Sequence, residues 1–186
     1  MHATDNEGAR MVLVLTTSGT TGDSKPVPYS LRRLLSSGIA VAESLRLSES
    51  DVCLNVMPLH HVGGIVCALM APLVSRGRCV CAQTFDEEAW FVQMKAHAAT
   101  WFYATPAIFG RILSVGATPE EPLPSLRLLR SGGAHLAHTD ALRLSARSRC
   151  AVLPTYSMSE CMPIASPPPD YELSSPGSVG PPLGVE

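Results

Sequence analysis

The stretch that most constrains this chain is Thr16–Lys25, a loop rich in hydroxyl groups and glycine that follows a short apolar run. The run Met11–Leu15 has the length and composition of a strand, and we expect it to be buried. Gly19 and Gly22 permit backbone angles closed to other residues, so the main chain can approach a ligand closely. Successive backbone N–H groups in such a loop bind anions, and Lys25 adds a positive charge. The stretch therefore predicts a polyphosphate site, although a plain surface turn would have a similar composition.

The segment after the loop predicts a helix. Pro26 and Pro28 should keep the chain out of a regular strand or helix until about Ser30, which can cap a helix over about Leu31–Leu47. Apolar residues recur in this helix at spacings of three and four, and we expect them to form its packing face: Leu31, Leu34, Leu35, Ile39 and Ala42. The dipole of the helix would favour an anion bound near its first turn.

Strands and helices alternate through the rest of the chain. Strands are expected at 52–57, 78–82, 100–104, 126–130 and 151–154, and helices at 65–76, 86–97, 106–115 and 136–148. Pro72 should kink or split the first of these helices. The segment 163–182 is rich in Pro, Ser and Gly and is expected to be irregular. This order predicts an α/β fold, a layered and mostly parallel sheet flanked by helices.

The composition narrows the function classes. With 186 residues, of which 46% are hydrophobic, the chain can form about one domain with a real core. The net charge of −2 gives no basic surface for nucleic acid, so a nucleic-acid partner is not expected. No apolar stretch reaches the ~18 residues of a transmembrane helix, and the polar N-terminus is unlike a signal peptide. The six cysteines lack zinc spacing and are expected to be buried, reduced thiols. We therefore expect a cytoplasmic protein, with the peroxisome left open.

Three further turns combine small and polar residues at the ends of predicted strands. They are Pro58–Gly64, Ser131–Leu136 and Thr155–Glu160. Ligands of open α/β sheets bind at the carboxyl ends of strands, so we expect these turns to meet at one site. His60 and His61 could be metal ligands, but no third ligand is in view and adjacent residues point apart. The turns would otherwise be ordinary strand exits.

Together with the first loop, these segments resemble the motifs of the adenylate-forming enzymes, which include acyl-CoA synthetases, luciferases and adenylation domains. Thr17–Val27 is similar to their phosphate loop, Thr-Ser-Gly-[Ser/Thr]-Thr-Gly-x-Pro-Lys-Gly-Val, but has Ser24 in place of Pro and Pro26 in place of Gly. Pro58–Gly64 resembles Pro-Leu-Phe-His-x-x-Gly. The resemblance extends from residue 16 to residue 186.

The later motifs resemble the same family. Ser131–Leu136 is similar to Ser-Gly-Gly-Ala-Pro-Leu, with His135 in place of Pro. Thr155–Glu160 is similar to Tyr-Gly-x-Thr-Glu. Gly177–Glu186 resembles Gly-Ser-Val-Gly-Arg-Pro-Leu-Pro-Gly-Val-Glu, one residue shorter.

The resemblance implies a role for each matched residue. The loop residues Ser18, Gly19, Thr20, Thr21 and Gly22 would bind ATP, and Thr17 and Lys25 would be catalytic. Gly132, Gly133 and Ala134 would line the adenine, on which Tyr156 would stack. Ser159 would donate to the α-phosphate, and Glu160, with Thr17, would hold Mg²⁺. His61 and Gly64 would lie at the substrate pocket.

The implied activity is ATP- and Mg²⁺-dependent activation of a carboxylic acid as its acyl-adenylate, followed by transfer to the thiol of coenzyme A. The resemblance also implies that residues 1–186 are a partial AMP-binding domain, truncated at both ends and without the family's C-terminal lid domain. Two alternatives stay open: a non-catalytic nucleotide-binding remnant, and part of a module that loads a carrier-protein thiol. Amino-acid-activating relatives carry an Asp near the two histidines, so an α-amino acid substrate is disfavoured. A Gly-x-Ser-x-Gly motif is missing, which argues against a serine hydrolase.

Overall fold

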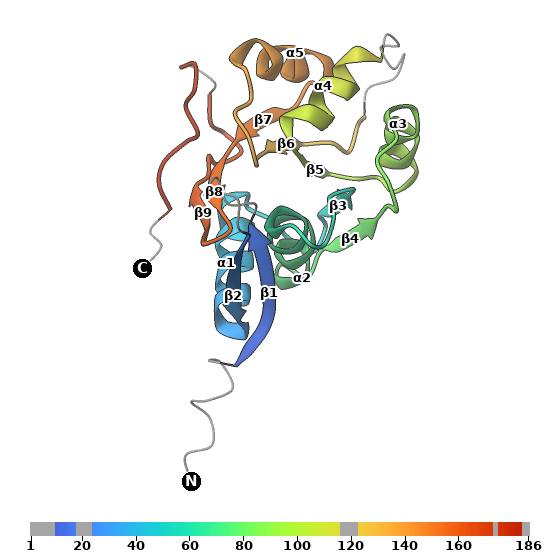
Figure 1. The fold of residues 1–186 in the computed structure, drawn as a ribbon. Helices are drawn as coiled ribbons and strands as arrows, with labels where there is room; N and C mark the ends of the chain where they lie inside the picture. The colour runs from blue at the N-terminus through green and yellow to red at the C-terminus, as the bar shows by residue number, and fades with distance from the viewer. Residues whose placement is uncertain (1–9, 18–23, 116–122, 173–174, 184–186) are drawn as a thin grey trace.

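A five-stranded parallel sheet forms the centre of the molecule (Figure 1). The computed structural model describes residues 10–17, 24–115, 123–172 and 175–183. The strands lie in the order β4-β3-β5-β6-β7. Their bounds are β3 Val52–Asn55, β4 Arg78–Cys81, β5 Trp101–Ala104, β6 Leu128–Ser131 and β7 Ala151–Pro154. The predicted α/β fold with a parallel sheet is confirmed.

Helices cover both faces of this sheet (Figure 1). On one face lie α1 (Leu31–Ser44), the π-helix η1 (Gly63–Met70) and α2 (Ala71–Val74). On the other face lie α3 (Glu87–Ala96), α4 (Pro106–Ser114) and α5 (His138–Ser148). η1 passes into α2 just before Pro72, and the backbone stays helical at Met70 and Ala71. The helix changes type near this proline, and the predicted kink or split stays a prediction.

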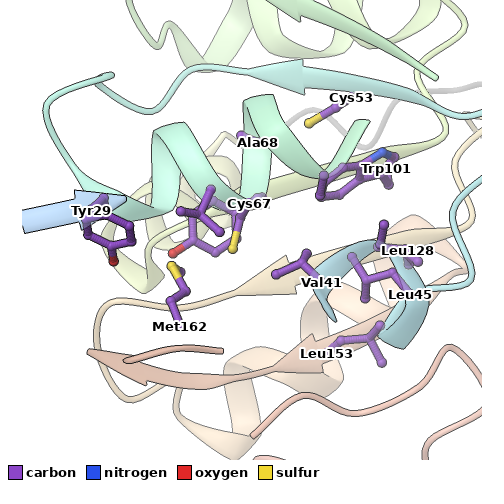
Figure 2. Close-up of a cluster of buried hydrophobic side chains, with 14 of the residues drawn as sticks. Tyr29, Val41, Leu45, Cys53, Cys67, Ala68, Trp101, Leu128, Leu153 and Met162 are labelled. Carbon is purple, nitrogen blue, oxygen red and sulfur yellow. The ribbon is translucent and has the colours of Figure 1, made fainter. Parts of the chain in front are cut away.

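Each strand contributes side chains to two separate hydrophobic cores. In β5, Trp101 and Tyr103 point to the core under α1 and η1, whereas Phe102 points to the core under the three other helices. Figure 2 shows the first core, where Val41 of α1 meets Trp101 and Leu153 of the sheet. Burial on both faces is typical of parallel strands that lie between two helix layers.

The N-terminal segment forms a separate antiparallel hairpin beside α1 (Figure 1). It consists of β1 (Met11–Thr17) and β2 (Lys25–Ser30). The prediction that β1 is buried was wrong in part, because side chains alternate across the hairpin and only Leu15 is fully covered. Met11 and Val14 are exposed among the described residues.

Two prolines lie inside β2, and the prediction that they exclude a strand was wrong. Pro26 and Pro28 are exposed and alternate with Val27 and Tyr29, which are buried. Both strands of a two-stranded sheet are edges, where a missing N–H is tolerated. The apolar alternation therefore decides the conformation of this segment.

Helix α1 begins where expected, and its predicted packing face is correct in part. The Ser30 hydroxyl accepts a hydrogen bond from the backbone N–H of Arg33 at 3.2 Å, which confirms the predicted cap. Leu34 packs against the core and Ala42 is buried, as predicted, whereas Leu31, Leu35 and Ile39 are exposed. The other buried positions are Ser37, Gly38 and Val41. Small residues on this face allow close helix packing, since a Cβ on Gly38 would lie 3.1 Å from Met70 Cβ of η1.

A second hairpin follows the central sheet. It consists of β8 (Tyr156–Met158) and β9 (Cys161–Ala165), which pair antiparallel. The expectation of a loop at 155–160 and an irregular segment from 163 was wrong for these strand residues, because short strands with few β-branched residues give little periodic signal. The Leu183 N–H donates to the Ile164 oxygen at 2.9 Å, so the chain near its described end returns to β9.

All six cysteines are unpaired thiols, as expected, but the expected burial is complete for only two of them. Cys53 and Cys67 are buried, and burial raises the pKa of both thiols. Cys81 is exposed at the edge of the sheet. Within the residues that the structure describes, no helix has the length and apolar character needed to span a membrane.

Candidate functional site

Glycines shape the turn that follows β6. Gly132 is buried, and a Cβ there would lie 2.8 Å from the Tyr103 hydroxyl oxygen and 3.0 Å from Thr155 Cγ2. Gly133 has a φ of +83°, a conformation that other residues adopt only with strain. The main chain therefore turns sharply at the carboxyl end of β6 and leaves Gly133 and Ala134 exposed.

A cavity of about 290 Å³ opens between this turn and the beginning of β8. Its lining residues are Gly133, Ala134, His135, Thr155, Tyr156, Ser157 and Val179. A smaller hollow of about 30 Å³ adjoins it and shares Ala134, His135, Thr155 and Val179. The structure thus brings three predicted nucleotide residues, Gly133, Ala134 and Tyr156, to one concave site.

The base of the β8–β9 hairpin is fixed by a buried arginine. Arg130 of β6 is completely buried, and its guanidinium donates to Thr155 Oγ1 at 3.0 Å and to Ser166 Oγ. Thr155 Oγ1 in turn donates to the Ala165 oxygen at 2.6 Å. These bonds tie β6 and β7 to both ends of the hairpin, and they hold Tyr156 at the mouth of the cavity.

Ser159 and Glu160 form the tip of this hairpin and do not line the cavity. The Tyr29 hydroxyl of β2 donates to the Ser159 oxygen. The Glu160 side chain is exposed. The tip therefore meets the N-terminal hairpin, which carries the other predicted phosphate residues.

Thr17 and Lys25 are directly paired across the N-terminal hairpin, at the two ends of the predicted phosphate loop. Lys25 is exposed and begins β2. Ser18, Gly19, Thr20, Thr21 and Gly22 lie outside the described residues. The roles of these seven residues stay predictions.

His61 lies in the turn after β3, at the carboxyl edge of the sheet, and is exposed. Its backbone N–H donates to the Pro58 oxygen at 3.1 Å, and its ring centroid lies 4.4 Å from that of His60. Gly64 is buried, and a Cβ there would lie 2.3 Å from the Pro58 oxygen. The turn therefore requires glycine at position 64 for steric reasons. The predicted contact of Gly64 with substrate stays a prediction.

Sequence reasoning missed four residues that line the cavity, and one of them, Ser157, lies inside the Thr155–Glu160 motif. Thr155 was noted only as the first residue of a motif, His135 only as a replacement for proline, and Val179 only as part of the Gly177–Glu186 resemblance. Val179 approaches from the segment after β9, which no local pattern could place. The signal for His135 and Thr155 was their position directly after a strand end.

The comparisons with known proteins agree with this geometry. A family model described as AMP-binding enzyme matches residues 2–186. The chain belongs to this family. It is 38% identical over 180 residues to an oxalate–CoA ligase of Arabidopsis thaliana, in a match that covers 94% of this chain and 35% of that protein. It is 33% identical over 175 residues to a sulfoacetate–CoA ligase of Cupriavidus necator, over 93% of this chain and 34% of that protein.

Solved structures of AMP-binding enzymes share the fold. The crystal structure of ATP-bound MatB from Rhodopseudomonas palustris matches with a TM-score of 0.83 and 32% identity, over 92% of this chain and 33% of that chain. The chain therefore spans about a third of the length of the relatives it matches.

The donor set suits ATP and Mg²⁺. Gly133 and Ala134, which have little or no side chain, line the cavity together with the exposed aromatic ring of Tyr156. Within the described ranges, no group of three or more His, Cys, Asp or Glu side chains could hold a metal ion by itself. Mg²⁺ in nucleotide sites commonly takes only one or two carboxylates and completes its shell with phosphates and water. An exposed Glu160 fits that pattern.

Proposed function

We propose that this chain forms the nucleotide-binding part of an AMP-forming CoA ligase that activates a short carboxylic acid bearing a second anionic group. The observation that carries the proposal is the cavity between Gly133–Ala134 and Tyr156, in a chain that belongs to the AMP-binding family. The cavity has room for a base and part of a ribose. It lies at the carboxyl end of a parallel sheet, where such folds bind ligands.

The adenosine would bind against the turn after β6. Tyr156 is 50% exposed, so its ring is free to stack on a base. Gly133 and Ala134 also line the cavity and have little or no side chain to block the base. Base stacking on an aromatic ring is worth about 1–3 kcal/mol, which makes Tyr156 the main anchor.

The phosphates would lie toward the N-terminal hairpin. Lys25 supplies a mobile positive charge and Ser159 a hydroxyl donor, while Glu160, with Thr17, would hold Mg²⁺. When bound, the metal neutralises phosphate charge during displacement of pyrophosphate. The protein's own contribution is to position the carboxylate substrate in line with the α-phosphate.

The substrate class comes from the relatives and from the turn after β3. Two relatives are named for oxalate and sulfoacetate, which are short acids with two anionic groups. His60 and His61 are both exposed at this edge, with ring centroids 4.4 Å apart. Neighbouring imidazoles offer N–H donors to a second anionic group. Transfer of the activated acyl group to coenzyme A would follow.

The proposal is tested first by binding and then by exchange. Calorimetric titration of the chain should show MgATP binding that is weakened by about 1–3 kcal/mol in Tyr156→Ala. Binding should be unchanged in Leu142→Ala, a control at an exposed site on α5. ATP–pyrophosphate exchange should be slow, and oxalate and sulfoacetate should stimulate it more than glyoxylate and acetate, their singly charged counterparts. Absence of MgATP binding would refute the nucleotide site. Equal stimulation by the four acids would refute the substrate class.

A further inference from the structure

One arginine from a distant part of the chain holds the tip of the β8–β9 hairpin. Arg33 lies in the first turn of α1, and its Nη2 donates to the main-chain oxygens of Glu160 and, at 3.4 Å, of Ser159. Its Nη1 donates to the Pro28 oxygen of β2 at 2.9 Å. The guanidinium therefore joins β2 and α1 to two consecutive residues that lie more than a hundred positions away.

Tyr29 makes a second contact to the same tip. Its hydroxyl donates to the Ser159 oxygen, and the Arg33 guanidinium lies 4.2 Å from its ring centroid. Tyr29 is completely buried, and burial raises the pKa of its hydroxyl against the opposing effect of the Arg33 charge. The hydroxyl therefore stays a neutral donor over the physiological pH range. Two donors that stack on each other thus converge on one turn.

The hydrogen bonds from Arg33 restrict the orientations open to the Ser159 and Glu160 side chains. A planar guanidinium presents its N–H groups in a rigid fork, so it fixes two acceptors better than a flexible ammonium group does. Because the acceptors are the carbonyl groups of Ser159 and Glu160, the backbone of both residues is held from the side of β2. The Ser159 hydroxyl and the Glu160 carboxylate are therefore attached to Cα atoms whose positions are fixed. An unanchored tip of a short hairpin would sample many more orientations.

We infer that Arg33 is a positioning residue of the nucleotide site. It holds the Ser159–Glu160 tip beside β2, where the phosphates and Mg²⁺ would bind. The inference rests on the proposed function, since it takes the roles of Ser159 and Glu160 from it. Arg33 acts through the backbone of the tip. The first turn of α1 thus links the strand that begins at Lys25 to the carboxylate expected to hold the metal.

The first experiment tests, without any ligand, whether Arg33 restricts the motion of the β8–β9 tip. Hydrogen exchange of the whole chain is compared between wild type, Arg33→Ala, Arg33→Lys and Arg32→Ala, a control at an exposed neighbour on the same helix. In Arg33→Ala the amides of the tip should exchange roughly tenfold faster, while those of β6 and β7 stay protected. Arg32→Ala should match the wild type, and Arg33→Lys should lie between.

The second experiment measures positioning. The dissociation constants of MgATP and of adenosine are determined for the same variants. Arg33→Ala should weaken MgATP binding roughly tenfold and change adenosine binding less than about twofold, because the base cavity is untouched. Arg33→Lys should recover part of the MgATP affinity, since lysine keeps the charge but loses the fork.

The outcomes separate the inference from the proposed function. Unchanged exchange at the tip, or faster exchange spread evenly over the molecule, overturns the anchoring. Equal losses of MgATP and adenosine affinity overturn the positioning role. A wild-type chain that binds no MgATP refutes the proposed function and the positioning of a metal group, while the exchange data still decide whether Arg33 anchors the tip.

Discussion

The two edges of the parallel sheet are built in opposite ways. At the amino edge, Asp51, Thr100 and Arg127 directly precede β3, β5 and β6, and they bind one another. Asp51 accepts from the Arg127 guanidinium at 2.7 and 3.0 Å and from the Thr100 hydroxyl at 2.7 Å. At the carboxyl edge, glycine turns and exposed side chains such as His61 and Tyr156 follow the strands.

The difference indicates that the amino edge stabilises the fold and that the carboxyl edge carries the candidate binding site. The polar groups of the amino edge satisfy each other, and Arg127 also donates to the Leu45 oxygen at the end of α1. Such a network joins strands and a helix, and its donors and acceptors are used within the protein. The carboxyl edge keeps donors, an aromatic ring and bare backbone at a cavity. Substitutions at the two edges should therefore affect different measurements.

The largest effect on stability is expected at the amino edge. Arg127→Ala leaves the Asp51 carboxylate, whose side chain is 6% exposed, without its charged partner. We expect a loss of about 3 kcal/mol in the free energy of unfolding, measured by urea denaturation. Arg143→Ala, which removes a surface pair with Asp140, should cost less than about 0.5 kcal/mol. Equal losses in the two variants would contradict the role of the network.

The largest effect on function is expected from Gly133→Val. Gly133 lines the cavity, so a branched side chain there adds bulk at the cavity wall. It must also adopt a φ of +83°, which costs about 1–2 kcal/mol in stability. MgATP affinity should fall at least about tenfold, as a blocked base site requires. The matched control is Gly110→Ala, where a Cβ meets nothing within 4 Å. Undiminished ATP binding in calorimetry would place the nucleotide elsewhere.

Tyr156→Ala should affect binding without affecting stability. Loss of stacking should weaken MgATP binding by about 1–3 kcal/mol. Because the ring is half exposed, the free energy of unfolding should change by less than about 0.5 kcal/mol. A drop in thermal stability with normal affinity would reverse the assignment of this residue.

The smallest expected effect is a pH dependence at the amino edge. Burial opposes ionisation of Asp51, but hydrogen bonds from Arg127, Thr100 and Ser48 outweigh it and lower the pKa of the carboxyl. A lowered folded-state pKa contributes stability above about pH 4, and this contribution is lost as pH falls through the folded pKa. Urea titrations from pH 6 to pH 3 should show this loss in wild type and not in Asp51→Asn. Parallel curves for the two proteins would contradict it.

The sequence predicted the central sheet because long apolar runs alternate with helical patterns. It also predicted that the turns at Gly133 and Tyr156 meet, since both follow parallel strands. The prediction failed for β2, where the burial of Val27 and Tyr29 outweighs the effect of two prolines. It also failed for part of the packing face of α1, where small residues such as Gly38 are buried in place of large ones.

The remaining features depend on contacts between distant segments. Arg33 reaches a tip that lies 127 positions away in sequence, and Asp51 binds an arginine 76 positions away. Neither pair has a local pattern, because each partner alone resembles an ordinary surface charge. Only the arrangement of the elements in space brings such groups together.

The most direct test of the nucleotide site is photoaffinity labelling of the whole chain with 8-azido-ATP in the presence of Mg²⁺, followed by peptide mapping. The label should attach to the turn at Gly133–His135 or to Tyr156, and excess ATP should abolish it. Label confined to other peptides, or label that ATP does not displace, would contradict a nucleotide site at the carboxyl edge.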